Sequence, residues 1–239
     1  MDRSFRGRVA LVAGGTGALG AAIARAFAAA GAHVVVTYRR ADELEALVAS
    51  AGADAPAIEG HAVDAGDEAA VKSMADAIVA RHRRLDVMVN AIGGYAGGTP
   101  LWKNAPDVLA RMLVQNAASG YTLARAVVPA MLAARRGAIV NVAARAGVAP
   151  EAGAAEYAAS KAAAIAMMAA LAADLMGTGV RVNSVLPSII DTPANRRAMP
   201  NADASRWPTP EAIARVVLFL ASDDADLVHG ASIPVYGHG

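Results

Sequence analysis

Short apolar runs alternate with longer alanine-rich segments along most of the chain. The short runs contain many β-branched residues and predict strands at 9–13, 33–37, 58–63, 87–90, 138–142, 181–186 and 232–235. The longer segments have helical spacing and predict helices at 18–30, 42–51, 67–82, 106–135, 155–176 and 210–221. Strands that are apolar on both faces are typical of a parallel sheet covered by helices. The alternation therefore predicts one doubly wound α/β domain over residues 1–239, with a parallel sheet of about seven strands.

Two segments interrupt this alternation. Residues 93–106 contain four glycines and two prolines, and residues 191–210 contain four prolines among mixed polar residues. Glycine and proline clusters of this kind mark loops. A twenty-residue irregular segment in a compact domain is typical of a lid, although a surface insertion is the plainer alternative. We expect a substrate loop or lid at about 191–210.

Composition narrows the class of protein. The formal net charge is +1, so no basic surface is expected for nucleic acid. The longest apolar stretch, at 162–173, is too short to cross a membrane, and the first residues lack a signal-peptide pattern. The absence of cysteine is compatible with a reducing, cytoplasmic location. The five histidines (His33, His61, His82, His229, His238) show no metal-ligand spacing, so no metal is expected.

A glycine-rich turn follows the first predicted strand and opens the first predicted helix. Its residues run from Gly14 to Gly20 in the order GGTGALG. Glycines allow a tight turn and a close approach of the backbone, while free N–H groups at the helix start can bind a pyrophosphate. The position after the first strand favours a dinucleotide-binding, Rossmann-like turn over a purely structural one.

Tyr157 and Lys161 lie four residues apart on one predicted helix, so both face the same side. A nearby ammonium stabilises a phenolate, and we expect it to lower the tyrosine pKa from about 10 toward the working pH. A phenol tuned in this way can donate and accept protons. Only three lysines occur in the chain, which singles out this pair as candidate chemistry.

These motifs together resemble the short-chain dehydrogenase/reductase family across nearly the whole chain. Gly14 and Gly20 match its glycine motif, although Ala18 replaces the middle glycine. The resemblance implies that Tyr157 is the acid/base, that Lys161 activates it, and that Asn116 holds a proton-relay water. It also implies a cofactor-binding set comprising Gly14, Thr16, Gly17, Leu19, Gly20, Arg39, Asp64, Asn90, Ala91, Gly93, Tyr157, Lys161, Pro187, Ile190 and Thr192.

The end of the second predicted strand bears on the choice of nicotinamide cofactor. Tyr38 stands where the family's NAD-specific members place a carboxylate, and Arg39 follows. A guanidinium suits a 2′-phosphate both by charge and as a forked donor. We therefore expect NADP(H) to be favoured over NAD(H), unless Arg39 and Arg40 are simply solvated residues at the start of a helix.

One member of the family's catalytic set is missing. Its serine, thirteen residues before the tyrosine, corresponds to Ala144. Loss of one preorganised donor to a substrate oxygen typically costs a factor of about 10²–10³ in rate. Ser160, Ser119 and Ser188 are weak candidates to replace it.

The dihydropteridine reductase branch of the family shares an alanine followed by a basic residue at this point, here Ala144 and Arg145. It also resembles this chain in the glycine loop, in 91–98 and in 186–210, whereas Asn116 and Arg39 depart from it. The resemblance implies reduction of a small cyclic C=N or C=O substrate. Tyr95 and Trp207, on the two irregular segments, are candidates to stack on a flat heterocycle.

Two other functions stay open: a general carbonyl or 3-oxoacyl reductase, against which Ala144 argues, and a non-catalytic dinucleotide-binding sensor. The predicted 155–176 helix carries small residues on every face. Because family members commonly pair through this helix, the resemblance implies a homodimer or homotetramer.

Overall fold

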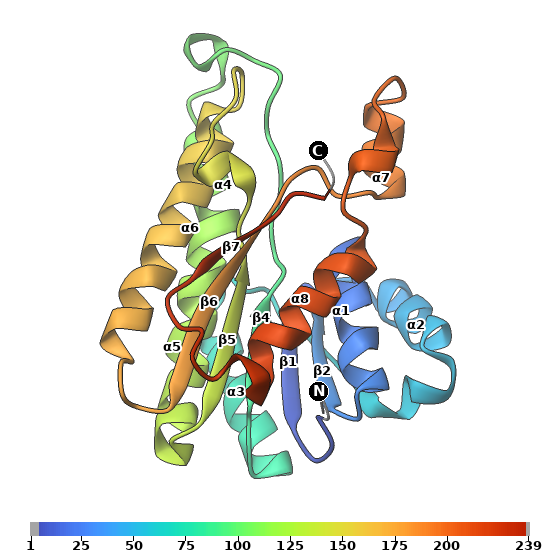
Figure 1. Ribbon diagram of the computed structural model, residues 1–239, viewed down its shortest axis with the longest axis vertical. Helices are drawn as coiled ribbons and strands as arrows, with labels where there is room; N and C mark the ends of the chain where they lie inside the picture. Colours follow the sequence, from blue (N-terminus) through green and yellow to red (C-terminus); the bar gives the residue numbers. More distant parts are fainter. Residues whose placement is uncertain (1–4, 238–239) are drawn as a thin grey trace.

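The computed structural model describes residues 5–237, except the side chains of residues 55 and 56, and its strands form one parallel sheet (Figure 1). The strand order is β3-β2-β1-β4-β5-β6-β7. The strands are β1 (Val9–Ala13), β2 (His33–Tyr38), β3 (Ile58–Ala62), β4 (Val87–Asn90), β5 (Gly137–Val142), β6 (Val180–Pro187) and β7 (Ser232–Val235). The order reverses between β1 and β4, where doubly wound sheets bind their ligands. The predicted fold class and strand number are confirmed.

Each face of the sheet has its own core because alternate residues of a strand point to opposite sides. In β1, Ala10 and Val12 join one apolar cluster, while Leu11 and Ala13 join the other. The first cluster contains residues of α1 (Ala18–Ala29) and α8 (Pro210–Ala221), and Leu47 of α2 (Ala41–Ser50). The second contains residues of α3 (Glu68–His82), α5 (Ser119–Ala134) and α6 (Ala155–Asp174).

The single helix predicted over 106–135 is not one regular helix. It consists of α4 (Val108–Leu113), a π-helical turn (Val114–Ala118) and α5. A π-helical turn inserts one extra residue per turn and re-aims the side chains that follow, often at functional sites. Asn116 lies in the middle of this turn.

Both irregular segments project beyond the carboxyl ends of the strands (Figure 1). Residues 93–106 contain one short 3₁₀ turn, Leu101–Lys103. Residues 191–210 are more ordered than predicted, since they contain α7 (Pro193–Ala198) and a 3₁₀ turn, Ala204–Arg206. Thr192 caps α7 by accepting a hydrogen bond from Asn195 N at 3.2 Å, which explains why a helix forms in this proline-rich stretch.

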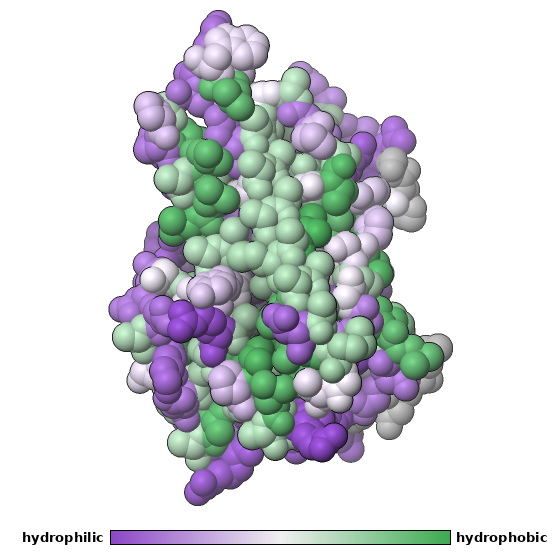
Figure 2. Space-filling view, turned by 90° about the vertical axis from the view of Figure 1, so that its left-hand side faces the viewer, coloured by the Kyte–Doolittle hydropathy of each residue, from purple (hydrophilic) through white to green (hydrophobic). Residues whose placement is uncertain are grey.

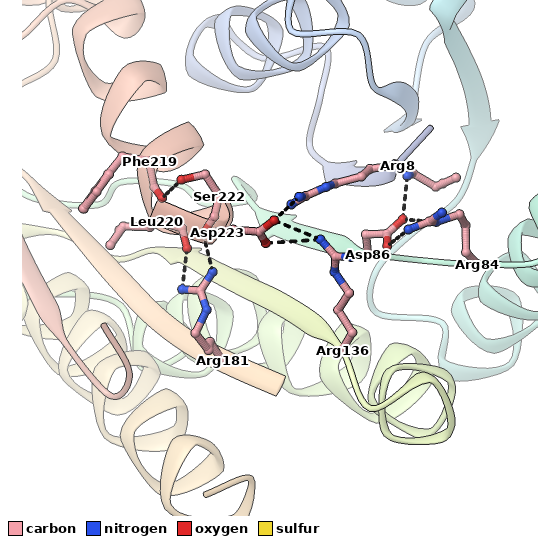
Figure 3. A network of polar contacts seen from close by, with 10 residues as sticks. Arg8, Arg84, Asp86, Arg136, Arg181, Phe219, Leu220, Ser222 and Asp223 are labelled. Atoms are coloured by element: carbon pink, nitrogen blue, oxygen red, sulfur yellow. Dashed lines mark hydrogen bonds and ion pairs between the residues drawn. The ribbon is translucent and has the colours of Figure 1, made fainter. Parts of the chain in front are cut away.

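At the opposite end of the sheet, where the strands begin, ion pairs connect neighbouring segments of the chain (Figure 3). Asp86 accepts hydrogen bonds from Val9 N and from the Arg84 guanidinium, and Asp223 pairs with Arg8 and Arg136. Among the described residues, no helix has both the length and the apolar character needed to cross a bilayer.

Candidate active site

The glycine-rich turn between β1 and α1 is held in place by close backbone contacts. Gly14 has φ +73°, and its N–H donates to Thr37 Oγ1 at 2.9 Å. A Cβ added at Gly20 would lie 2.0 Å from Gly14 O, so α1 and the turn approach each other more closely than any side chain allows. The sequence-based interpretation identified these glycines but missed Thr37, whose buried hydroxyl joins the turn to β2.

The N-terminus of α1 is open toward this turn. Gly17 is the N-cap residue, and because it has no side chain it cannot cap the backbone N–H groups of the first turn. α1 is twelve residues long, and such an N-terminus is a favourable site for phosphate. The close approach of Gly14 and Gly20 and the uncapped N-terminus of α1 together suit the pyrophosphate of a pyridine dinucleotide.

Two arginines follow β2, and they differ in their contacts. Arg40 pairs with Asp42, its Nε lying 3.0 Å from Asp42 Oδ1. Arg39 is exposed and has no hydrogen bond or ion pair with any residue that the structure describes. Glu43 lies nearby and accepts a hydrogen bond from Thr16 Oγ1 at 3.0 Å. Of the two guanidiniums, Arg39 is therefore the one available to a ligand.

Asn116 joins the 93–106 segment to the middle of the site. Its Oδ1 accepts from Gly94 N at 2.9 Å, and its Nδ2 donates to Gly94 O at 3.1 Å and to Ser160 Oγ at 3.0 Å. A Cβ added at Gly93 would lie 3.0 Å from Asn116 Oδ1 and 3.1 Å from Lys161 Nζ. The π-helical turn thus brings Asn116, Gly93 and Lys161 together.

The carboxyl ends of β1, β4 and β5 form the base of the site beside Asn116 and Lys161. Ala91 N donates to Ala13 O at 3.0 Å, and Asn90 Nδ2 donates to Asn141 Oδ1 at 3.0 Å. Leu19 is buried behind the glycine turn. Asp64 is exposed after β3 and accepts from Gly66 N at 2.9 Å, so its carboxylate shapes its own turn.

Lys161 is only 4% exposed and points from α6 toward the end of β5. Its Nζ donates to Val142 O at 3.1 Å. Burial penalises the charged form and lowers the pKa of Lys161 to about 8. The Lys161 ammonium, bound to the carbonyl of the last β5 residue and close to Gly93 and Asn116, can donate hydrogen bonds to ligand hydroxyls at the carboxyl ends of the strands.

Tyr157 is half-buried one helical turn before Lys161. Burial, followed by the neighbouring phenol of Tyr95, raises the pKa of Tyr157 to about 12. The expectation of a lowered tyrosine pKa is therefore wrong for this structure. The physical reason is that desolvation disfavours the phenolate, while the Lys161 ammonium is directed to Val142 O.

Of the two aromatic residues predicted to contact substrate, one lies at the site. The Tyr95 and Tyr157 rings meet edge to face with centroids 5.0 Å apart. Trp207 is half-buried on the 191–210 segment, and within the described residues it forms no ring contact with either tyrosine.

Ala144 follows β5 and is buried, with no hydroxyl at this position. Each serine considered as a replacement donates its hydroxyl to a backbone carbonyl: Ser160 to Tyr157 O, Ser119 to Gln115 O and Ser188 to Tyr236 O. None of the three is free to replace the missing donor without breaking such a bond.

The residues expected to contact the nicotinamide lie at the end of β6. Pro187 is the last residue of that strand, and Ile190 O accepts from Asn195 Nδ2 at 2.8 Å. Thr192 follows as the N-cap of α7. This stretch therefore leads from the sheet edge directly into the 191–210 segment.

A family model described as short chain dehydrogenase matches residues 8–203. The chain belongs to the short-chain dehydrogenase family. It is accordingly an NAD(P)-dependent oxidoreductase, which removes the alternative of a non-catalytic sensor. The solved short-chain dehydrogenase/reductase of Mycobacterium ulcerans is 28% identical, with a TM-score of 0.93 over 98% of this chain and 90% of that one.

Curated relatives of this short-chain dehydrogenase act on alcohols and carbonyls, according to their names. D-threitol dehydrogenase of Mycolicibacterium smegmatis is 36% identical over 99% of this chain and 95% of its own. The 3-oxoacyl-acyl-carrier-protein reductase of Thermotoga maritima is 32% identical, with 98% of each chain covered. A xylitol dehydrogenase solved with NAD+ is 27% identical, with a TM-score of 0.90 over 98% of this chain and 99% of that one. These relatives support the oxidoreductase class and do not support the dihydropteridine reductase branch.

The fold also gathers three ionisable side chains at the other edge of the sheet. His33 and His82, far apart in sequence, have ring centroids 4.2 Å apart, and Glu59 lies between their Nε2 atoms. The expectation of no metal considered only spacing along the chain and could not foresee this group. His238 lies outside the described residues.

Proposed function

We propose that this short-chain dehydrogenase reduces a small, flat, conjugated C=N or C=O substrate with NADPH, as the dihydropteridine reductases do. The single observation that carries this proposal is Ala144, buried at the family's serine position, while the candidate replacement serines donate their hydroxyls to backbone carbonyls. An isolated ketone depends strongly on a donor to its developing oxyanion. A conjugated C=N spreads developing charge over the ring and depends less on that donor.

Bound NADPH would supply a hydride. In this proposal Tyr157 donates the proton to the substrate nitrogen or oxygen, because a phenol with a pKa of about 12 is fully protonated at neutral pH. Lys161 orients ribose hydroxyls and helps the phenol to recover its proton. Asn116 positions a water, since it is fixed by Gly94 and Ser160.

The remaining cofactor residues take the roles that the family resemblance implies. Gly14, Gly17 and the N–H groups of α1 bind the pyrophosphate, and Arg39 binds the 2′-phosphate. The negative charge of Glu43 would repel a 2′-phosphate. That charge is partly offset, because Glu43 accepts a hydrogen bond from Thr16 Oγ1 and Arg40 Nε lies 3.9 Å from Glu43 Oε1. We therefore keep NADPH as the favoured donor.

Tyr95 is the proposed substrate platform, because it is 69% exposed and its ring meets that of Tyr157. Trp207 reaches the substrate only if the 191–210 segment closes over it as a lid. This lid closure is part of the proposal. The proposed lid belongs to the same single domain, residues 1–239, as the rest of the chain.

A second candidate is oxidoreduction of a polyol or a 3-oxoacyl carbonyl. It is favoured by the 36% identity to D-threitol dehydrogenase and the 32% identity to a 3-oxoacyl-acyl-carrier-protein reductase. In this case the water held by Asn116 would have to replace the serine hydroxyl.

We also propose that the chain forms a homodimer or homotetramer through α6. Figure 2 shows a broad apolar surface on the side where α5 and α6 lie in Figure 1. Five of the exposed residues of α6 form an alanine stripe at helical spacing: Ala159, Ala162, Ala166, Ala169 and Ala173. Val114 of the π-helical turn and Tyr121 of α5 add exposed apolar area. The lack of cysteine supports a cytoplasmic location for this assembly.

The test is steady-state turnover with a panel of substrates. A quinonoid dihydropterin and a cyclic imine are compared with a simple ketone, a 3-oxoacyl thioester and threitol in the oxidative direction, each with both nicotinamide cofactors. Faster turnover of the conjugated C=N substrates with NADPH supports the proposal. Rapid ketone, thioester or threitol conversion without C=N reduction would instead establish the second candidate.

A further inference from the structure

Three side chains with metal-binding atoms meet at the edge of the sheet where the strands begin. His33 is the first residue of β2, Glu59 is in β3, and His82 is the last residue of α3. Glu59 pairs in register with Val35, two residues after His33, so His33 and Glu59 project from the same face of the sheet. α3 packs on that face and brings His82 to them.

The distances within this group suit one shared ion. His82 Nε2 lies 3.0 Å from Glu59 Oε1, and His33 Nε2 lies 3.3 Å from Glu59 Oε2. The ligand atoms of all three residues lie within 4.8 Å of one another. Zinc binds nitrogen and oxygen at about 2.0–2.2 Å in a tetrahedron, which places neighbouring ligand atoms about 3.4 Å apart. The two imidazole-to-carboxylate distances run to different oxygens of Glu59. One is close to this value and the other is shorter, so small side-chain rotations would bring the three residues around one ion.

Two of the atoms also lack hydrogen bonds. In the part of the chain that the structure describes, the buried His33 Nε2 and Glu59 Oε2 have no hydrogen-bond partner. They face each other at 3.3 Å without the geometry of a hydrogen bond. Leaving such buried polar atoms without a partner is unfavourable, because their lost hydration is not replaced. A cation between them would satisfy both atoms, in place of the ion pair that Glu59 Oε2 makes with Arg81.

The guanidinium of Arg81 would compete with a bound cation for Glu59. Arg84 is bound to Asp86 at 2.6 Å, and Arg8 is paired with Asp223, so two nearby guanidiniums already have carboxylate partners (Figure 3). Arg81 Nη1 lies 3.2 Å from Glu59 Oε2, and its side chain is 70% exposed. Arg81 can therefore turn into solvent when an ion takes its place.

We propose that His33, Glu59 and His82 form a binding site for one Zn²⁺ ion, with water as the fourth ligand. Two imidazoles and one carboxylate form a donor set that zinc prefers. An open pocket of about 380 Å³ is lined by His33 and His82 and gives access to the site. The ion would join β2, the edge strand β3 and α3, so its role is to stabilise this edge of the sheet, away from the candidate active site.

The experiment titrates tag-free, chelator-treated protein with ZnCl₂ by calorimetry and follows thermal unfolding. We expect one Zn²⁺ per chain and a higher Tm with zinc. The variants His33→Gln and His82→Gln should each weaken binding by at least about 100-fold, since even residues that only support ligands change affinity 10–100-fold. The matched control His61→Gln, on the same strand as Glu59, should bind zinc like the parent.

Arg81→Gln keeps all three ligands and provides a variant that does not depend on the stability of the histidine mutants. It should bind zinc more tightly than the parent chain, because it removes the cation that competes for Glu59. Absence of saturable binding to the parent chain would overturn the proposal. Equal affinity in the parent and in a folded His33→Gln/His82→Gln double variant would also overturn it.

Discussion

The rings of Tyr95 and Tyr157 meet edge to face at 5.0 Å, with an interplanar angle of 73°. This contact joins an exposed residue of the 93–106 segment to the phenol that lies one turn before Lys161 on α6. It also places two phenols close enough for one to disfavour ionisation of the other. The site thus combines a flat apolar surface with a proton donor.

Replacing Tyr95 with phenylalanine keeps the ring contact and removes one phenol. We expect the pKa of Tyr157 to fall, by less than burial raises it, because burial is the larger cause of its increase to about 12. Ultraviolet difference titration of the tyrosines would detect this change. Tyr95→Leu should in addition raise KM for a flat substrate more than it lowers kcat.

Replacing Tyr157 with phenylalanine removes the proposed proton donor without changing the helix. Turnover should fall by about 10²–10⁴-fold, the usual contribution of a positioned acid. NADPH affinity, measured by fluorescence, should stay within a few-fold of the parent value. Unchanged turnover would remove Tyr157 from the mechanism.

Replacing Arg39 with aspartate should shift cofactor preference toward NADH. The reason is that Arg39 has no partner among the described residues and is the proposed contact of the 2′-phosphate. The comparison is kcat/KM with NADPH and with NADH. Arg40→Ala is the matched control, since Arg40 is already paired with Asp42, and it should leave the ratio nearly unchanged.

Replacing Lys161 with methionine should change how stability depends on pH. The folded pKa of about 8 lies below the ordinary value of 10.5, so between these values the unfolded chain binds the proton and the folded chain does not. The free energy of unfolding of the parent chain therefore rises with pH in this window, by about 3 kcal/mol at most.

The methionine variant lacks this contribution, so its stability should rise less steeply above pH 8. Urea unfolding of both chains on either side of that pH measures the difference. Parallel curves for the two chains would show that burial does not lower the pKa of Lys161. Above about pH 10 the raised pKa of Tyr157 acts oppositely in both chains, because the unfolded state then loses its phenolic proton first.

The sequence predicts the sheet well because its central strands, such as β1 and β4, are short buried runs of mostly apolar residues, and the glycine-rich turn directly follows β1. It also places Tyr157 and Lys161 together, since their spacing depends only on helical geometry. The π-helical turn at Asn116 has no such local signal, and it packs against α6, which is distant in sequence. The ordered α7 was missed, although Thr192 and Pro193 form a recognisable helix start.

Other features depend on tertiary contacts and cannot be predicted from spacing. The raised pKa of Tyr157 results from burial and, to a smaller extent, from Tyr95, which lies on a loop distant in sequence. The group formed by His33, Glu59 and His82 requires β2, β3 and α3 to be in place. The occupied hydroxyls of Ser160 and Ser188 likewise became evident only from their carbonyl partners.

Restoring a serine at Ala144 tests the central claim most directly. The measurement is kcat/KM with NADPH for a quinonoid dihydropterin and for a simple ketone, in the parent chain and in Ala144→Ser. We predict that the parent prefers the dihydropterin, and that the serine raises ketone reduction by about 10²-fold while changing dihydropterin reduction only a few-fold. A parent chain that already reduces the ketone faster than the dihydropterin, with no gain from the serine, would contradict the account.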